Sequence, residues 1–212
     1  MDDEVGWLKG AMGCLSWVIA FVIIILLALK ILFFEMAVIG NSAMAPTLLR
    51  DERVLINKRG SPELGQIAVC PNPEQEGYIV GRVAARGDMS LESFGNELKM
   101  NKQPVPVVPA GSTEFQNPDI ERLQRVSFGT EDFGEKPHTV FFDPEGTFRV
   151  RHVDLDPGQV YLIGDNRPQR GQDSRAFGPV EEASCIGTVV MRLTAVDGLQ
   201  GDLKHSAIPE LL

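Results

Sequence analysis

The run Gly10–Leu29 carries no charged side chain, and this constrains the chain more than any other feature. A membrane-spanning helix needs about 20 apolar residues, which extend about 30 Å at 1.5 Å per residue. The run has that length. Lys30 follows it and can reach the polar interface, while Trp7 and Trp17 suit the opposite interface. We therefore expect a transmembrane helix over 10–34, preceded by a short tail, 1–9.

A cleaved signal peptide is the alternative interpretation of this run. It would need a basic start and a shorter apolar stretch, whereas the chain begins with Asp2-Asp3-Glu4. Orientation is ambiguous from charge, because one basic residue precedes the span and several follow it (Lys9 before; Arg50, Arg53, Lys58 and Arg59 after). The positive-inside rule would place the following domain in the cytoplasm, but long domains translocate largely regardless of such charges.

Composition narrows the class of the remaining chain. The 212 residues allow one span and one domain of fair size, and 21 Gly and 14 Pro favour a turn-rich β protein. The net charge of −9 argues against a nucleic-acid partner. Cys14 lies in the apolar run, so only Cys70 and Cys185 could pair outside a membrane. We expect two free thiols, with a disulfide as the alternative in an oxidising compartment.

Short segments rich in Val, Ile, Phe and Tyr, bounded by turn residues, predict strands along the rest of the chain. The predicted strands are Arg53–Asn57, Gln66–Val69, Tyr78–Ala84, Thr139–Phe142, Thr147–Val153, Gln159–Ile163 and Cys185–Leu193. Gly95-Asn96 predicts a hairpin turn. The Pro-rich stretch Pro104–Asp119 predicts an irregular surface excursion, and the tail after Gly201 has no strong signal.

Several motifs occur in the order found in one protein family. They are Ser42-Ala43-Met44-Ala45-Pro46-Thr47-Leu48, Asp51–Lys58, Gly65–Val69, Tyr78–Val83, Asn96–Val105, Gly164-Asp165-Asn166-Arg167 and Asp173-Ser174-Arg175-Ala176-Phe177-Gly178-Pro179-Val180. Together they resemble bacterial type I signal peptidases (leader peptidases) over about residues 36–195. The resemblance implies a mostly β, signal-peptidase-like sheet or barrel domain after one transmembrane helix. Its core would comprise 36–88 and 151–200, with a smaller inserted β subdomain at 89–150 and a tail at 201–212.

The resemblance also implies a Ser–Lys dyad, in which a neutral lysine amine takes the proton of the serine. The nucleophile position is Ala43, and the lysine position is Gly81, beside Arg82. The loop Pro168–Gln172 lacks the serine that orients the lysine in the family. Ser42 is the alternative nucleophile, but a one-residue slip would turn its side chain to the opposite face. We expect no intact catalytic group.

Peptide binding does not need a nucleophile. The resemblance implies that the family holds its substrate as an added β-strand, and the corresponding groove here would be lined by Asn41, Ser42, Met44, Pro46, Tyr78 and Val80. Gly81 would leave space that enlarges this site. The resemblance implies structural roles for residues of the last two motifs, Gly164–Arg167 and Asp173–Val180, with an ion pair between Asp173 and Arg175. These residues are Asp165, Asn166, Arg167, Asp173, Ser174 and Arg175. Asp165 and Asp173 as paired acid–base carboxylates are the alternative.

No metal or cofactor is expected. His138 and His152 are far apart and lack a metal-ligand spacing, so we expect both to face solvent.

The sequence thus predicts a non-catalytic, single-pass member of the family on the extracytoplasmic (periplasmic) side of the bacterial inner membrane. Its partners would be the lipid bilayer and an extended, signal-peptide-like segment or a membrane protein. Two alternatives stay open. One is an active serine endopeptidase that removes signal peptides from exported preproteins, with Ala43 an inactivating substitution or Ser42 a shifted nucleophile. The other is a membrane-complex assembly subunit with a vestigial groove.

Overall fold

The computed structural model describes residues 17–25, 32–95, 97–134, 137–146 and 148–212. It divides into two units, 1–35 and 36–212. In the first unit, residues 17–25 are helical and mostly exposed, while much of the predicted span 10–34 lies outside the described residues. No helix in the described part of the chain has the length and apolar character needed to cross a membrane.

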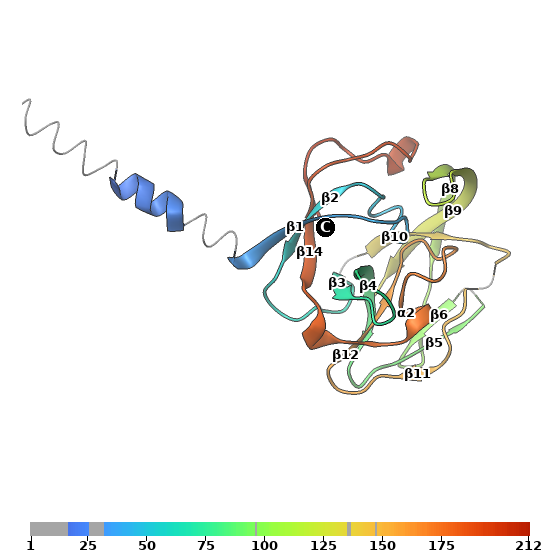
Figure 1. Cartoon of the computed structure of the whole chain (residues 1–212). Coiled ribbons are helices and arrows are strands. Elements are labelled where there is room, and N and C mark those ends of the chain that lie inside the picture. Colours follow the sequence, from blue (N-terminus) through green and yellow to red (C-terminus); the bar gives the residue numbers. More distant parts are fainter. Residues whose placement is uncertain (1–16, 26–31, 96, 135–136, 147) are drawn as a thin grey trace, which may run out of the picture. The chain divides into compact units, whose positions relative to one another are not determined.

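The second unit is built on one curled antiparallel sheet (Figure 1). Its strands run in the order β1-β2-β14-β3-β4-β12-β13, and β15 pairs with β14 away from this path. Their bounds are β1 (Phe34–Val38), β2 (Arg53–Asn57), β3 (Ile67–Pro71), β4 (Tyr78–Arg86), β12 (Gln159–Ile163), β13 (Val180–Glu181), β14 (Gly187–Arg192) and β15 (Glu210–Leu211). Segments from the two ends of the chain are therefore neighbours in one sheet.

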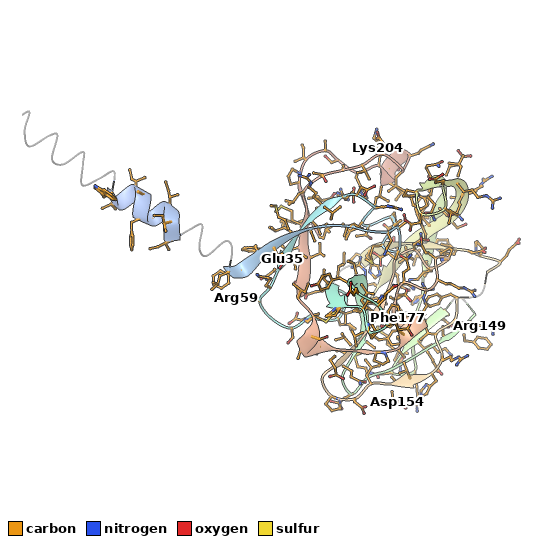
Figure 2. The ribbon with its side chains drawn as sticks, in the orientation of Figure 1. Glu35, Arg59, Arg149, Asp154, Phe177 and Lys204 are labelled. Atoms are coloured by element: carbon orange, nitrogen blue, oxygen red, sulfur yellow. A yellow bond between two sulfur atoms is a disulfide. The ribbon has the colours of Figure 1, made fainter. Side chains whose placement is uncertain are left out.

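Two smaller sheets are formed by the middle of the chain. One contains β5 (Ser90–Phe94), β6 (Glu97–Met100), β7 (Gln103–Val105) and β11 (Val153–Asp154), and the other contains β8 (Val108–Asn117), β9 (Arg122–Asp132) and β10 (Pro137–Phe142). Helical segments are short: α2 (Ser174–Phe177), η1 (Glu182–Ser184) and η2 (Gly201–Leu203). In Figure 2, Asp154 of β11 and Lys204, which follows η2, lie at opposite sides of this unit.

Both faces of β3 are buried, which explains its nearly continuous apolar sequence. Ala68 and Cys70 pack into one cluster with Ile79 of β4, whereas Ile67 and Val69 pack into another. Successive residues of a strand point to opposite faces, so this alternation fixes the register of β3. The sheet therefore separates two apolar layers.

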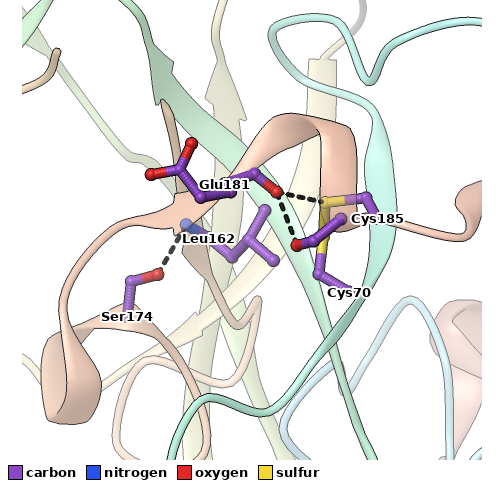
Figure 3. The surroundings of a disulfide bond; sticks show 6 residues. Cys70, Leu162, Ser174, Glu181 and Cys185 are labelled. Carbon is purple, nitrogen blue, oxygen red and sulfur yellow. Dashed lines mark hydrogen bonds between the residues drawn. A yellow bond between two sulfur atoms is a disulfide. The ribbon is translucent and has the colours of Figure 1, made fainter. Parts of the chain in front are cut away.

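Cys70 and Cys185 form a disulfide on the face of the sheet where both pack in the cluster with Ile79 (Figure 3). It joins β3 to the residues just before β14, and these positions are 115 residues apart in sequence. The expectation of two free thiols is therefore wrong, and the alternative weighed with it is correct. A disulfide of this kind is typical of an oxidising compartment.

Most predicted strands are confirmed, including β2 and β12 with the bounds that were expected. The pairing of β5 with β6 confirms the hairpin around residue 95. Two predictions are wrong. Pro104–Asp119 is not an irregular excursion, because β8 pairs with β9 over most of that stretch. Thr147–Val153 forms no strand in its described residues before Val153, where the two-residue β11 begins.

Candidate functional site

Ala43, the predicted nucleophile position, lies in a turn after β1 and is only 3% exposed. Its methyl side chain has no atom that could attack a carbonyl. Its N–H donates to Asn41 Oδ1 at 2.9 Å, and its carbonyl accepts from the N–H of Asn166 at 2.9 Å. A Cβ atom at Gly164 would lie 2.4 Å from the same carbonyl oxygen. Both backbone groups of Ala43 are therefore engaged, and the approach requires glycine at 164.

Ser42 precedes it and is fully buried. Its Oγ has no hydrogen-bond partner among the described residues. Its N–H donates to Asp119 Oδ2 at 2.7 Å, and its carbonyl accepts from Asn166 Nδ2 at 3.0 Å. A serine nucleophile needs a base within hydrogen-bond distance, about 2.6–3.2 Å. In the described part of the chain, Ser42 has no such base.

Gly81, the predicted lysine position, lies in β4 opposite Ala68 of β3. A Cβ atom at this position would lie 2.9 Å from Leu162 Cβ and 3.4 Å from the backbone nitrogen of Ile163. Contacts below 3 Å force a neighbour to move, and Leu162 is held in β12. The expectation that Gly81 leaves extra space is therefore wrong, since β12 closes that space.

The segment after β12 is held by Asp173 and Ser174. Asp173 Oδ2 accepts from the N–H of Gly164 at 2.9 Å and pairs with Arg175 Nη2 at 2.7 Å. Ser174 Oγ accepts from the N–H of Leu162 at 3.0 Å (Figure 3). The side chain of Asp173 also caps α2. These polar side chains thus fix the backbone that touches the positions of Ala43 and Gly81.

Asp165 and Arg82 form a buried ion pair beside this segment. Arg82 Nε and Nη2 donate to the two oxygens of Asp165 at 2.9 and 2.6 Å, and Thr47 Oγ1 donates to Asp165 Oδ2 at 2.5 Å. Burial by itself would raise the pKa of Asp165, but the charge of Arg82 and these hydrogen bonds outweigh it, so the pKa is lowered. Asp165 is therefore ionised and already satisfied, which disfavours a role as an acid–base catalyst.

A second buried pair lies next to it. Glu131 of β9 accepts from Arg167 Nη1 at 3.0 Å and lies 3.2 Å from His138 Nε2. Burial raises the pKa of Glu131, and the Arg167 charge with the His138 hydrogen bond reverses this to a lowered value. His138 is buried, so the expectation that it faces solvent is wrong, because Glu131 gives the ring a polar partner inside the protein. His152 is exposed, as expected.

The loop Pro168–Gln172 contacts the turn between β8 and β9. Gln169 Nε2 donates to Asp119 Oδ2 at 2.8 Å, the same oxygen that accepts from Ser42. Asn166 Nδ2 donates to Gln169 Oε1 at 3.1 Å. The family resemblance predicts an orienting serine in this loop. Instead, the amide of Gln169 makes hydrogen bonds to Asn166 and Asp119, which both contact Ser42.

The amino-acid sequence matches known proteins over most of its length. Residues 14–194 match the family described as "Signal peptidase, peptidase S26". The chain belongs to the signal peptidase family. It is 28% identical over 206 residues to signal peptidase IB of Staphylococcus aureus strain N315, covering 92% of this chain and 95% of the relative. It is 26% identical over 183 residues to signal peptidase I V of Bacillus subtilis strain 168, covering 82% and 95%.

The predicted groove residues of this signal peptidase homologue differ in accessibility. Met44 and Val80 belong to one apolar cluster, whereas Tyr78 is 61% exposed at the start of β4. Ser42 and Pro46 are buried and Asn41 is half-buried. The structure thus brings Met44 and Val80 together and leaves Tyr78 at the surface.

Sequence reasoning missed a separate pocket of about 460 Å³ and the residues that form it. Of the predicted groove residues only Pro46 lines it, together with Arg192 of β14 and His205 of the tail. No turn, repeat or metal-ligand spacing marked His205. Among the residues described here, no group of three or more His, Cys, Asp or Glu side chains could hold a metal ion.

Proposed function

We propose that this chain is a non-catalytic member of the signal peptidase family that binds an extended peptide segment. The observation that carries the proposal is the chemistry at two positions: Ala43 supplies no nucleophile, and Gly81 supplies no base. Ser42 is a poor substitute, because its hydroxyl is buried without a hydrogen-bond partner among the described residues. A dyad mechanism needs both groups within hydrogen-bond distance.

The backbone around Ala43 also supports this proposal. Acyl transfer requires free N–H donors near the nucleophile to stabilise the developing oxyanion. Here the N–H groups of Ser42 and Ala43 donate to Asp119 and Asn41. A substrate carbonyl would have to displace these internal acceptors.

Strand addition is the favoured binding mode, because β4 has an unpaired stretch. β12 pairs with Arg82–Arg86 of β4 and its Leu162 also lies against Gly81, while Tyr78–Val80 pair only with β3 among the described strands. An extended peptide could hydrogen-bond to this free edge, with the partly buried Val80 offering an apolar contact. Two of the predicted groove residues, Tyr78 and Val80, belong to this stretch.

We further propose a single membrane span over 10–34 and a domain on the extracytoplasmic side. The uncharged run Gly10–Leu29 supports the span. The Cys70–Cys185 disulfide supports the side, since the cytoplasm keeps thiols reduced. This argument weighs against the orientation that the basic residues after the span would favour.

A cleavage assay tests the catalytic part of the proposal. The purified full chain in detergent should release no product from a preprotein with an Ala-x-Ala site. The Staphylococcus aureus relative, assayed in parallel, serves as the reference. The double variant Ala43→Ser/Gly81→Lys should also stay inactive, because Leu162 occupies the space for the lysine stem. Specific cleavage by the unaltered chain that Ser42→Ala abolishes would overturn the proposal.

Photocrosslinking tests peptide binding. Benzoylphenylalanine replaces Tyr78 in one variant and Phe94 in a matched control, since both side chains are aromatic and strongly exposed. A biotinylated signal peptide should crosslink at position 78 and not at 94. Equal labelling at both positions, or labelling at neither, would contradict strand addition along β4.

A further inference from the structure

The last residues of the chain form a strand on the main sheet. Residues 195–212 lie beyond the match to the family, yet β15 pairs with β14, placing Leu211 opposite Met191 and Glu210 opposite Arg192. The N–H of Leu212 donates to the carbonyl of Val190 at 3.1 Å. The tail therefore fills a sheet edge.

That edge exists because β3 and β14 diverge. β3 pairs only with Gly187 and Thr188 of β14, and β2 covers the other edge as far as Arg192. The remaining edge, Val190–Arg192, would otherwise present unpaired backbone groups. Unpaired edges of this kind are where an extended segment adds to a sheet.

The occupying strand is short and exposed. Its ladder has two residue pairs, and Leu211 is 75% exposed. Residues 206–209 are exposed as well. Before β15, both ring nitrogens of His205 make close polar contacts. Nδ1 lies 2.6 Å from Glu52 Oε1, and Nε2 lies 2.6 Å from the carbonyl oxygen of Pro46. If β15 left β14, the contacts of His205 would still hold the rest of the tail in place.

Arg192 places a positive charge at this edge, opposite Glu210. Its side chain is 4% exposed and pairs with the half-exposed carboxylate of Glu210. Its Nε is buried without a hydrogen-bond partner in the described residues, and Glu52 Oε1 lies 3.9 Å away. A carboxylate that reached both Nε and Nη2 would make the bidentate contact that Glu210 does not make.

Apolar contacts lie two residues beyond Glu210. Leu212 is partly buried against the cluster that contains Ile67 and Val189. The same residues line the pocket of about 460 Å³, together with Leu211. An aliphatic residue two positions after the carboxylate is therefore accommodated.

We propose that the β14 edge at Val190–Arg192 is a strand-addition site for an extended polypeptide with a carboxylate followed by two aliphatic residues, and that β15 is its displaceable internal ligand. The site does not involve Ala43 or Gly81, so it goes beyond the proposed function and does not depend on it.

Binding in trans tests the proposal on the full chain in detergent. The probe is a fluorescein-labelled peptide with the sequence of Ser206–Leu212. Glu210→Lys in the chain should loosen β15 through repulsion from Arg192, so the probe should bind this variant at least tenfold more tightly than the unaltered chain. Glu97→Lys is the control, because it makes the same charge change at an exposed position of β6.

The same probe with Lys in place of Glu210 should not bind the Glu210→Lys chain. Equal affinity of both probes, or the same gain in the Glu97→Lys chain, would overturn the proposal. Hydrogen exchange gives an independent measurement on the unaltered chain. The Leu212 amide should exchange at least tenfold faster than amides of the β2–β14 ladder, and equal protection would show that β15 is not displaceable.

Discussion

Arg82 and Asp165, 83 residues apart in sequence, are joined by two hydrogen bonds inside the protein. The pair connects β4 to the Gly-Asp-Asn-Arg segment after β12. Removing one partner of a buried pair leaves the other charge uncompensated and costs about 3–5 kcal/mol. The pair is therefore a determinant of stability beside the candidate site.

Asp165→Asn should lower the free energy of unfolding by about 3–5 kcal/mol, because Arg82 then lacks its counter-charge. Urea unfolding followed by far-ultraviolet circular dichroism measures this. Asp154→Asn is the control, since Asp154 is exposed and surface changes stay within about 0.5 kcal/mol. Similar losses in both variants would contradict the role assigned to the pair.

Gly81→Ala should destabilise the protein by about 1–3 kcal/mol, because the new methyl group would meet Leu162 Cβ at 2.9 Å. Gly40→Ala is the matched control, since a Cβ atom there has no neighbour within 4 Å. The same unfolding measurement compares the two. If Gly81→Ala left the free energy of unfolding unchanged, β12 would be able to shift and accommodate the new methyl group. The steric argument for the inactivity of the Ala43→Ser/Gly81→Lys variant would then fail.

Reduction of the Cys70–Cys185 bond should lower the free energy of unfolding by about 2–4 kcal/mol, since the bond closes a long loop. Dithiothreitol should have this effect on the unaltered chain and none on the Cys70→Ala/Cys185→Ala variant. Thiol labelling under denaturing, non-reducing conditions should modify Cys14 alone. Labelling of Cys70 or Cys185 would show that the bond is absent.

Stability should fall in acid, because the pKa values of Asp165 and Glu131 are lowered in the folded protein. Between the folded and unfolded pKa values, the unfolded chain binds more protons than the folded protein does. The stabilisation from these two ionised carboxylates is therefore complete above the unfolded pKa values, about 3.9 for Asp and 4.3 for Glu. It is lost as the pH falls below these values toward the folded ones. Urea midpoints between pH 7 and 3 measure the slope, which Asp165→Asn should reduce. An unchanged slope would contradict this origin.

Local sequence patterns predicted the parts of the fold that depend on short-range order. Val, Ile and Tyr content bounded by turn residues was enough for β2 and β12. The same reasoning missed β8, because its Pro and Gly residues suggest a loop and its ladder with β9 is a tertiary contact. Propensity does not report such pairing.

The candidate site shows the same division. The absence of a nucleophilic or basic side chain at Ala43 and Gly81 can be inferred from the sequence, because it depends only on residue type. The bond from Ser42 to Asp119 spans 77 residues, and the closure of Gly81 by Leu162 depends on how two strands approach. His205 contacts Glu52 across 153 residues for the same reason. Contacts set by topology could not be derived from local patterns.

The close approach of Gly164 to the carbonyl of Ala43 has a consequence for how such proteins are recognised. A backbone oxygen imposes the requirement for glycine, and every residue type carries that oxygen. The Gly-Asp-Asn-Arg motif is therefore compatible with any small side chain at position 43. It is a signature of loop architecture, and by itself it does not report which side chains stand at positions 43 and 81.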